Sequence, residues 1–278
     1  MSSHLACVGL AAADSGEFGR LVERANATAQ SVGTYDGVRV VRWQDPSGAA
    51  LVLGWRAGEC VDLLPTYASA AGGRFADCRL INESVASAAV VDADGDQLTA
   101  MAFEAEQYRQ MKAIGQPVAG AARITALGVS VQVHADVEAF AASPDSLLDS
   151  SADPADEPPP HFVERGWSWP PRVASESFFS HGIWGDPAES TAHAQLSGVV
   201  IKAGHRTCVL TGQGFSVATV RSVGFEADVC LSDAEHPVTP EPGNIVSGTV
   251  FLVASIEPVG VDRRPSQIRG LFRRGRIT

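Results

Sequence analysis

The sequence predicts an α+β chain in which an N-terminal mixed β-sheet domain with few helices is followed by a small all-β barrel. Apolar and polar residues alternate through much of the chain, which is the period of strands that bury one face. Turn-forming stretches separate the alternating runs, as at 45–48 (Asp-Pro-Ser-Gly) and 92–95 (Asp-Ala-Asp-Gly). Helical spacing is confined to short stretches, so strands dominate the prediction.

The N-terminal stretch predicts the element order β-α-β-β-β over residues 4–64. Residues 4–12 are expected to form a strand, and Asp14 or Ser15 then caps a helix that Gly33 is expected to end. Further strands are expected at 38–43, 49–55, 60–64, 75–81, 85–92, 97–103 and 123–134, with short helices at 104–112 and 137–142.

The most regular pattern is the all-β module at 195–256, with strands expected at 196–201, 215–220, 227–231 and 246–256. Upstream of it, residues 144–160 contain five prolines, five acidic residues and no base, a composition that cannot bury enough surface to fold alone. We therefore expect four regions: an α+β domain at 1–143, an acidic Pro-rich linker at 144–172, the barrel domain at 173–261 and a basic, disordered tail at 262–278.

Charge is unevenly distributed along the chain. The formal net charge is −11, which disfavours non-specific nucleic-acid binding by the body of the protein. Only the tail is basic, so nucleic acid or another polyanion is expected to bind there alone. The residues that would bind it are Arg263, Arg264, Arg269, Arg273, Arg274 and Arg276.

The compartment is predicted from cysteines and apolar runs. Five cysteines occur without a CxxC pair, which favours reduced thiols in a cytoplasmic protein. The apolar run at 5–13 follows no basic region, so no signal peptide is expected, and no run reaches the length of a membrane span.

No catalytic constellation is apparent, and neither a cofactor nor a metal is expected. The chain has no G-x-S-x-G elbow, and its Gly-rich stretch at 211–214 lies between strands rather than before a helix. The best metal candidates are His205, Cys208, Cys230 and His236, whose spacing matches no standard zinc module. We expect the two cysteines to be buried and the two histidines to be solvated.

The entrance to the barrel domain is rich in aromatic residues. These rings either fill the space between the two domains or form an exposed site for a partner. The candidate partner-binding residues are Trp167, Trp169, Phe178, Phe179 and Trp184.

Two weak resemblances follow from these patterns. The βαβββ order with its Asp-Pro-Ser-Gly turn resembles a unit of the glyoxalase/vicinal-oxygen-chelate superfamily, which implies a cleft with a divalent metal. Val52 and Thr99 stand where that family's acidic ligand is expected, which implies that the metal chemistry is lost. The turns at 211–212 and 242–244 with their flanking strands resemble an OB barrel, which implies a nucleic-acid or oligosaccharide face. The whole chain resembles proteins of high-GC bacteria that have no assigned activity.

The sequence therefore favours a non-catalytic cytoplasmic binding or scaffold protein with a protein partner. A small-molecule-binding protein or metal-dependent enzyme of the vicinal-oxygen-chelate type is the first alternative. Nucleic-acid binding through the OB-like barrel and the Arg-rich tail is the second. Oligomeric state is left open, with a homo-oligomer among the alternatives.

Overall fold

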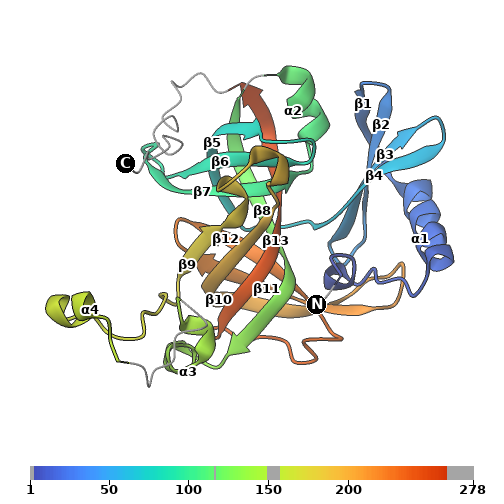
Figure 1. Cartoon of the computed structure of the whole chain (residues 1–278). Helices are drawn as coiled ribbons and strands as arrows, with labels where there is room; N and C mark the ends of the chain where they lie inside the picture. The colour runs from blue at the N-terminus through green and yellow to red at the C-terminus, as the bar shows by residue number, and fades with distance from the viewer. Residues whose placement is uncertain (1–2, 116, 149–156, 262–278) are drawn as a thin grey trace.

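The computed structural model describes residues 3–115, 117–148 and 157–261. Strands dominate, as the alternation predicts, and they form one four-stranded and one nine-stranded sheet (Figure 1). Within the described part of the chain, no helix is long and apolar enough to cross a membrane.

The expected strand at 4–12 is wrong, because this stretch contains the 3-10 helix η1 (Ala6–Val8). Gly9 ends it with a φ of 68°, and the apolar residues Cys7, Val8 and Leu10 are buried against the large sheet instead of pairing as a strand. Cys7, for example, places its Sγ 3.1 Å from the carbonyl oxygen of Gly128. The apolar run marks burial here, but not strand pairing.

Helix α1 (Ser15–Thr28) follows, as expected, with Asp14 as its N-cap; the Asp14 side chain accepts a hydrogen bond from the backbone N–H of Glu17 at 2.8 Å. The helix ends before Gly33, because Gly33 lies inside a strand that the sequence did not predict. That strand, β1 (Gln30–Tyr35), is largely exposed and lacks an apolar period. The order is therefore one helix and then four strands.

The four-stranded sheet is an antiparallel meander in chain order, and α1 packs beside it (Figure 1). Its remaining strands are β2 (Val38–Gln44), β3 (Ala49–Arg56) and β4 (Glu59–Tyr67). The turn at 45–48 joins β2 to β3, as its sequence predicts.

The nine-stranded sheet contains all later strands. They are β5 (Gly72–Leu80), β6 (Val85–Val91), β7 (Gln97–Ala105), β8 (Val118–His134), β9 (Ser177–Ser180), β10 (His193–Thr207), β11 (Gly214–Ser222), β12 (Phe225–Ser232) and β13 (Ile245–Val261). The helices α2 (Tyr108–Ile114), α3 (Val137–Ala142) and α4 (Pro160–Arg165) lie outside it. Residues 104–107, expected to be helical, end β7 and precede α2.

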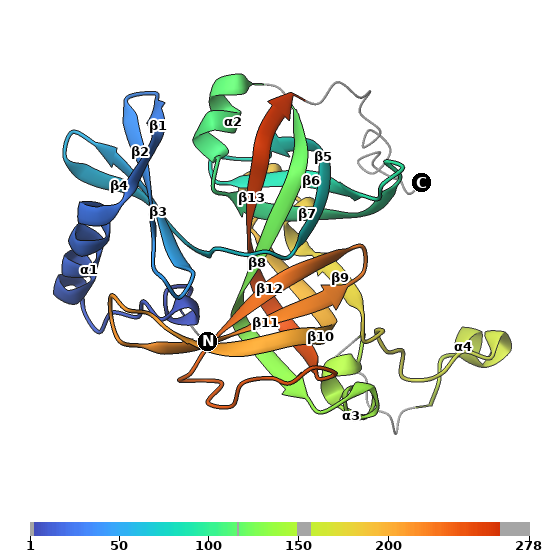
Figure 2. The ribbon, with the colours of Figure 1, turned by 180° about the vertical axis from the view of Figure 1, so that it is seen from behind.

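Two long strands organise this sheet. β8 and β13 each span 17 residues and pair with each other along most of their length (Figure 2). At one end, pairing runs from β8 through β12, β11 and β10 to β13; at the other, it runs from β8 through β5, β6 and β7 to β13. Each of these two series of pairings is closed, because β13 also pairs with β8. Strands from before and after residue 143 therefore belong to one sheet.

The buried residues form two main clusters. One lies among the strands of the large sheet and includes Phe75, Phe103, Ile124 and Leu196. The other joins the small sheet to the large one, since Leu51 and Leu53 belong to the same cluster as Leu127, Val253 and Phe251. This shared core fixes the two sheets against each other.

Candidate functional site

The segment 67–71 crosses from the small sheet to the large one and is held by buried hydrogen bonds. The Thr125 hydroxyl donates to the carbonyl oxygen of Tyr67 at 3.1 Å, and the Arg123 guanidinium donates to that of Ser69 at 3.2 Å. The Asp228 carboxylate, 4% exposed, accepts from the Ser69 hydroxyl at 2.8 Å and from the Ala70 N–H at 3.1 Å. The crossing segment is therefore positioned by β8 and β12.

One cavity, which we name the Arg123 cavity, lies on one side of this segment and has a volume of about 270 Å³. Its lining is mainly polar and comes from β2, β8, β13 and the stretch after β7. The lining residues are Arg42, Gln44, Tyr67, Ala68, Ser69, Glu106, Arg123, Thr125, Ser255 and Glu257.

A second cavity, the Lys202 cavity, has a volume of about 180 Å³ and shares Tyr67 and Ala68 with the first. β10 contributes Lys202 and Arg206, and β11 and β12 contribute Thr219 and Asp228. The crossing segment lies between the two cavities, and its residues Tyr67 and Ala68 line both of them. A small ligand in either cavity can therefore contact this segment.

Most of the basic side chains that line the two cavities form no ion pair with a described carboxylate. Arg42 is the exception, because its Nε lies 2.8 Å from Oε2 of Glu106, whose Oε1 accepts from Thr66. Arg123, Lys202 and Arg206 form no ion pair with any carboxylate in the described ranges. In a chain of net charge −11, this leaves three exposed basic side chains beside the crossing segment, where Glu106, Asp228 and Glu257 also line the two cavities.

Tyr67 lies where the two cavities meet. Burial raises the pKa of its phenol, while the neighbouring Arg206 guanidinium lowers it to a smaller extent. The phenol is therefore protonated at neutral pH and can donate a hydrogen bond. Asp228 cannot easily accept another donor, since Thr219, Ser69 and Ala70 already bond to it.

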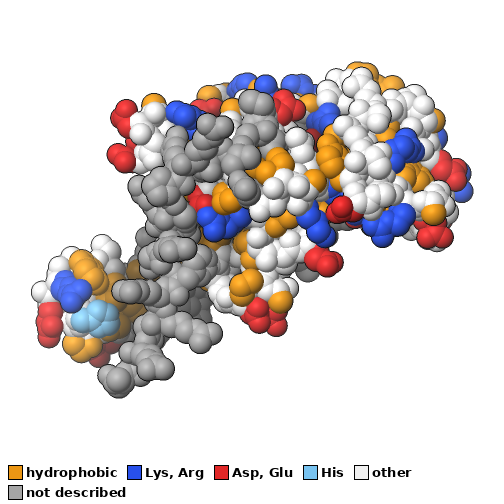
Figure 3. Space-filling model, turned by 90° about the horizontal axis from the view of Figure 1, so that it is seen from above, with side chains coloured by type: hydrophobic (Ala, Val, Ile, Leu, Met, Phe, Trp, Pro, Cys, Tyr) orange, Lys and Arg blue, Asp and Glu red, His pale blue; other side chains and the backbone are white. Residues whose placement is uncertain are grey.

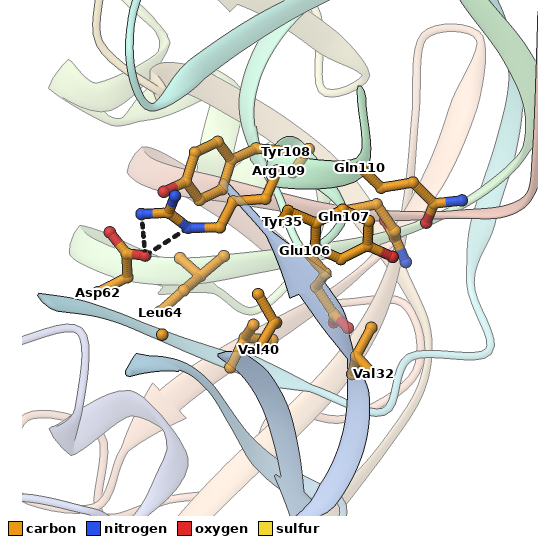
Figure 4. A pocket seen from close by; sticks show the side chains of 13 residues that line it. Val32, Tyr35, Val40, Asp62, Leu64, Glu106, Gln107, Tyr108, Arg109 and Gln110 are labelled. Carbon is orange, nitrogen blue, oxygen red and sulfur yellow. Dashed lines mark hydrogen bonds and ion pairs between the residues drawn. The ribbon is translucent and has the colours of Figure 1, made fainter. Parts of the chain in front are cut away.

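A third recess between the small sheet and α2 is too small for a ligand. It measures about 30 Å³, roughly the room of one or two water molecules. Figure 4 shows Arg109 extending over Leu64 to Asp62, with its Nε 2.7 Å from Oδ2 of Asp62. Burial raises the pKa of the adjacent Tyr108 to about 12. The Arg109–Asp62 pair links α2 to β4 at this recess.

The sequence-based metal candidates are not brought together. Cys208 and Cys230 are buried as expected, and burial raises the pKa of both thiols. His205 is exposed and pairs with Asp233 at 2.7 Å, while His236 is partly buried. Among the residues with described positions, no group of three or more His, Cys, Asp or Glu side chains is arranged to hold a metal ion.

The aromatic segment splits into two clusters. Phe162, Trp167 and Trp169 pack together around α4, which projects from the body of the molecule and exposes hydrophobic side chains at the left of Figure 3. Phe179 and Trp184 form a separate parallel pair beside β9, with ring centroids 6.3 Å apart.

Exposure differs among these aromatic residues. Trp167 is 52% exposed, and Phe179 and Trp184 are each 51% exposed. Phe178 instead packs against the core, with its ring 4.9 Å from that of Phe225. One ring is therefore packed against the core of the large sheet, and three are half exposed.

The six candidate arginines of the tail lie outside the described residues, as does the stretch 149–156 of the expected linker. The candidate site residues predicted from the sequence did not include Tyr67, Arg123, Lys202 or Arg206. A usable signal existed, because the chain contains only two lysines and one of them is Lys202.

No family model, curated protein or solved structure matches this chain. The resemblances to the glyoxalase superfamily and to OB barrels therefore stay predictions.

Proposed function

We propose that this protein is a non-catalytic binding protein whose ligand is a small, hydrophilic anion held in the Arg123 and Lys202 cavities. The observation that supports this most directly is the position of Arg123, Lys202 and Arg206. These three exposed bases form no ion pair among the described residues and line the two cavities beside the crossing segment of an acidic chain.

The lining chemistry fits a carboxylate or phosphate group. A guanidinium presents paired N–H donors that match two oxygens of such a group, and an ammonium adds a point charge. The Tyr67 phenol supplies a neutral donor between them. Glu257 at the Arg123 cavity favours a ligand that also carries a hydroxyl or amine donor.

Calorimetric titration of the full chain with inorganic phosphate and with citrate tests the proposal. Replacing Lys202 and Arg206 together by Gln is expected to weaken binding at least tenfold, which corresponds to about 1.4 kcal/mol. The matched control is Arg56→Gln plus Lys112→Gln, which makes the same charge change outside both cavities. Equal weakening by both double variants would show a general charge effect and would contradict the site.

A protein partner is the second candidate function, favoured by the half-exposed rings of Trp167, Phe179 and Trp184. The vicinal-oxygen-chelate and nucleic-acid alternatives have no comparable support among the described residues. Binding of the intact chain to immobilised single-stranded DNA at low salt, lost when the six tail arginines are replaced, would revive the nucleic-acid alternative.

A further inference from the structure

The parallel pair of Phe179 and Trp184 lies on an acidic face. Asp186 and Glu189 are exposed directly after Trp184, and the exposed Glu83 is close by. Its neighbour Asn82 anchors this stretch, since Nδ2 of Asn82 donates to the carbonyl oxygen of Ser190 at 3.0 Å. We name Phe179, Trp184, Asp186 and Glu189 the aromatic-acidic face.

Such a face suits a cation. Arginine binds preferentially over aromatic rings, and nearby carboxylates add favourable electrostatic energy. The same chain already contains such a contact, because the guanidinium of Arg165 lies over the Trp167 ring at 4.8 Å. Trp184 has an exposed fraction close to that of Trp167 but no basic partner over its ring within the described residues.

We propose that the aromatic-acidic face binds the Arg-rich segment 262–278 of the same molecule. This segment has six Arg and one acidic residue, which makes it the one strongly basic stretch of an acidic chain. Its charge is complementary to Asp186 and Glu189, and its guanidinium groups suit the rings of Phe179 and Trp184.

The chain can reach the face. Strand β13 pairs with β7 at Val253 and Ala254, and the face lies beside β7 because the Ala102 N–H donates to the Ser180 hydroxyl at 2.8 Å. From Ala254 to Val261 the strand advances roughly 23 Å. The 17 residues that follow can span at most about 55 Å, which covers a return to β7.

The test uses the indole N–H signals of the five tryptophans in NMR spectra of the full chain at pH 8 and low salt. Trp184→Phe identifies the signal of Trp184. Replacing all six tail arginines by Gln is expected to shift that signal and to speed its exchange with water at least threefold. The signal of Trp167 is the matched control and should not move, because its own Arg165 is unchanged.

A second variant, Asp186→Asn plus Glu189→Gln, keeps the tail and should reproduce the Trp184 shift. Salt at 0.5 M should remove the difference between parent and variants, because it screens exposed charges. The proposal is overturned if the Trp184 signal ignores the six replacements. It is also overturned if Trp167 responds instead, or if the parent signal changes with protein concentration, which would indicate a second molecule.

Discussion

Two buried aspartates lie near the junction between the sheets, and they differ in what surrounds them. Asp45, 3% exposed, accepts from the backbone N–H groups of Ser47, Val209 and Leu210 at 2.9, 3.1 and 3.2 Å. Asp228 accepts from two hydroxyls and one N–H, and it lines a cavity with Lys202 and Arg206. The same carboxylate chemistry serves packing at Asp45, whereas Asp228 also lies beside a cavity that basic side chains line.

The largest expected effect is that of Asp45→Ala on stability. Three backbone N–H groups would lose their acceptor, and backbone donors cannot turn toward water as hydroxyls can. We expect the free energy of unfolding to fall by about 3 kcal/mol, measured by chemical denaturation. Asp94→Ala, at an exposed turn, should change it little. Anion affinity should stay unchanged in both variants. A loss of anion affinity in Asp45→Ala would contradict the distinction drawn between Asp45 and Asp228.

The pH dependence of stability follows from the same contacts. Burial by itself raises the pKa of Asp45, but the hydrogen bonds from Ser47, Val209 and Leu210 outweigh it and leave the pKa below the usual 3.8. The contribution of Asp45 is therefore complete above about pH 4 and is lost as the pH falls through the lowered pKa. Asp45→Asn should flatten the stability profile below pH 4, and an unchanged acid slope would contradict this.

The second effect is expected for Asp228→Asn. The NH2 group of the new amide would face N–H or O–H groups that now donate to the carboxylate. Because the Ser69 and Thr219 hydroxyls can rotate, we expect a loss of only about 2 kcal/mol in the free energy of unfolding. Phosphate affinity should rise roughly threefold, because a negative charge leaves the Lys202 cavity. Calorimetry checks the affinity. Unchanged or weaker binding would show that Asp228 is needed for the shape of the site.

These two aspartates also show how far sequence reasoning extends. The turn at 45–48 is readable from its residues, and so are most strands around it, because both depend on neighbours in the chain. The hydrogen bonds that Asp45 accepts from the backbone N–H groups of Val209 and Leu210 cross more than 160 residues and leave no local pattern.

The candidate site was hidden for the same reason. Arg42 comes from β2 of the small sheet, and Arg123 and Lys202 come from β8 and β10 of the large sheet, so residues far apart in the chain line the two cavities. The parallel pairings of β12 with β8 and of β13 with β7 complete the two closed series of strands, and no short-range sequence pattern predicts them. At residues 4–12 the apolar run is buried, but it contains a 3-10 turn and not a strand.

The smallest expected effect is that of Tyr67→Phe, which isolates one donor at the junction of the two cavities. The free energy of unfolding should change by less than about 1 kcal/mol, since the ring and its packing remain. Phosphate affinity should fall about fivefold, the value of roughly one hydrogen bond. Because burial keeps the phenol protonated, the parent's affinity should show no loss from Tyr67 up to pH 9. If Tyr67→Phe binds phosphate as well as the parent, the ligand contacts the cations alone, and the two cavities act as independent sites.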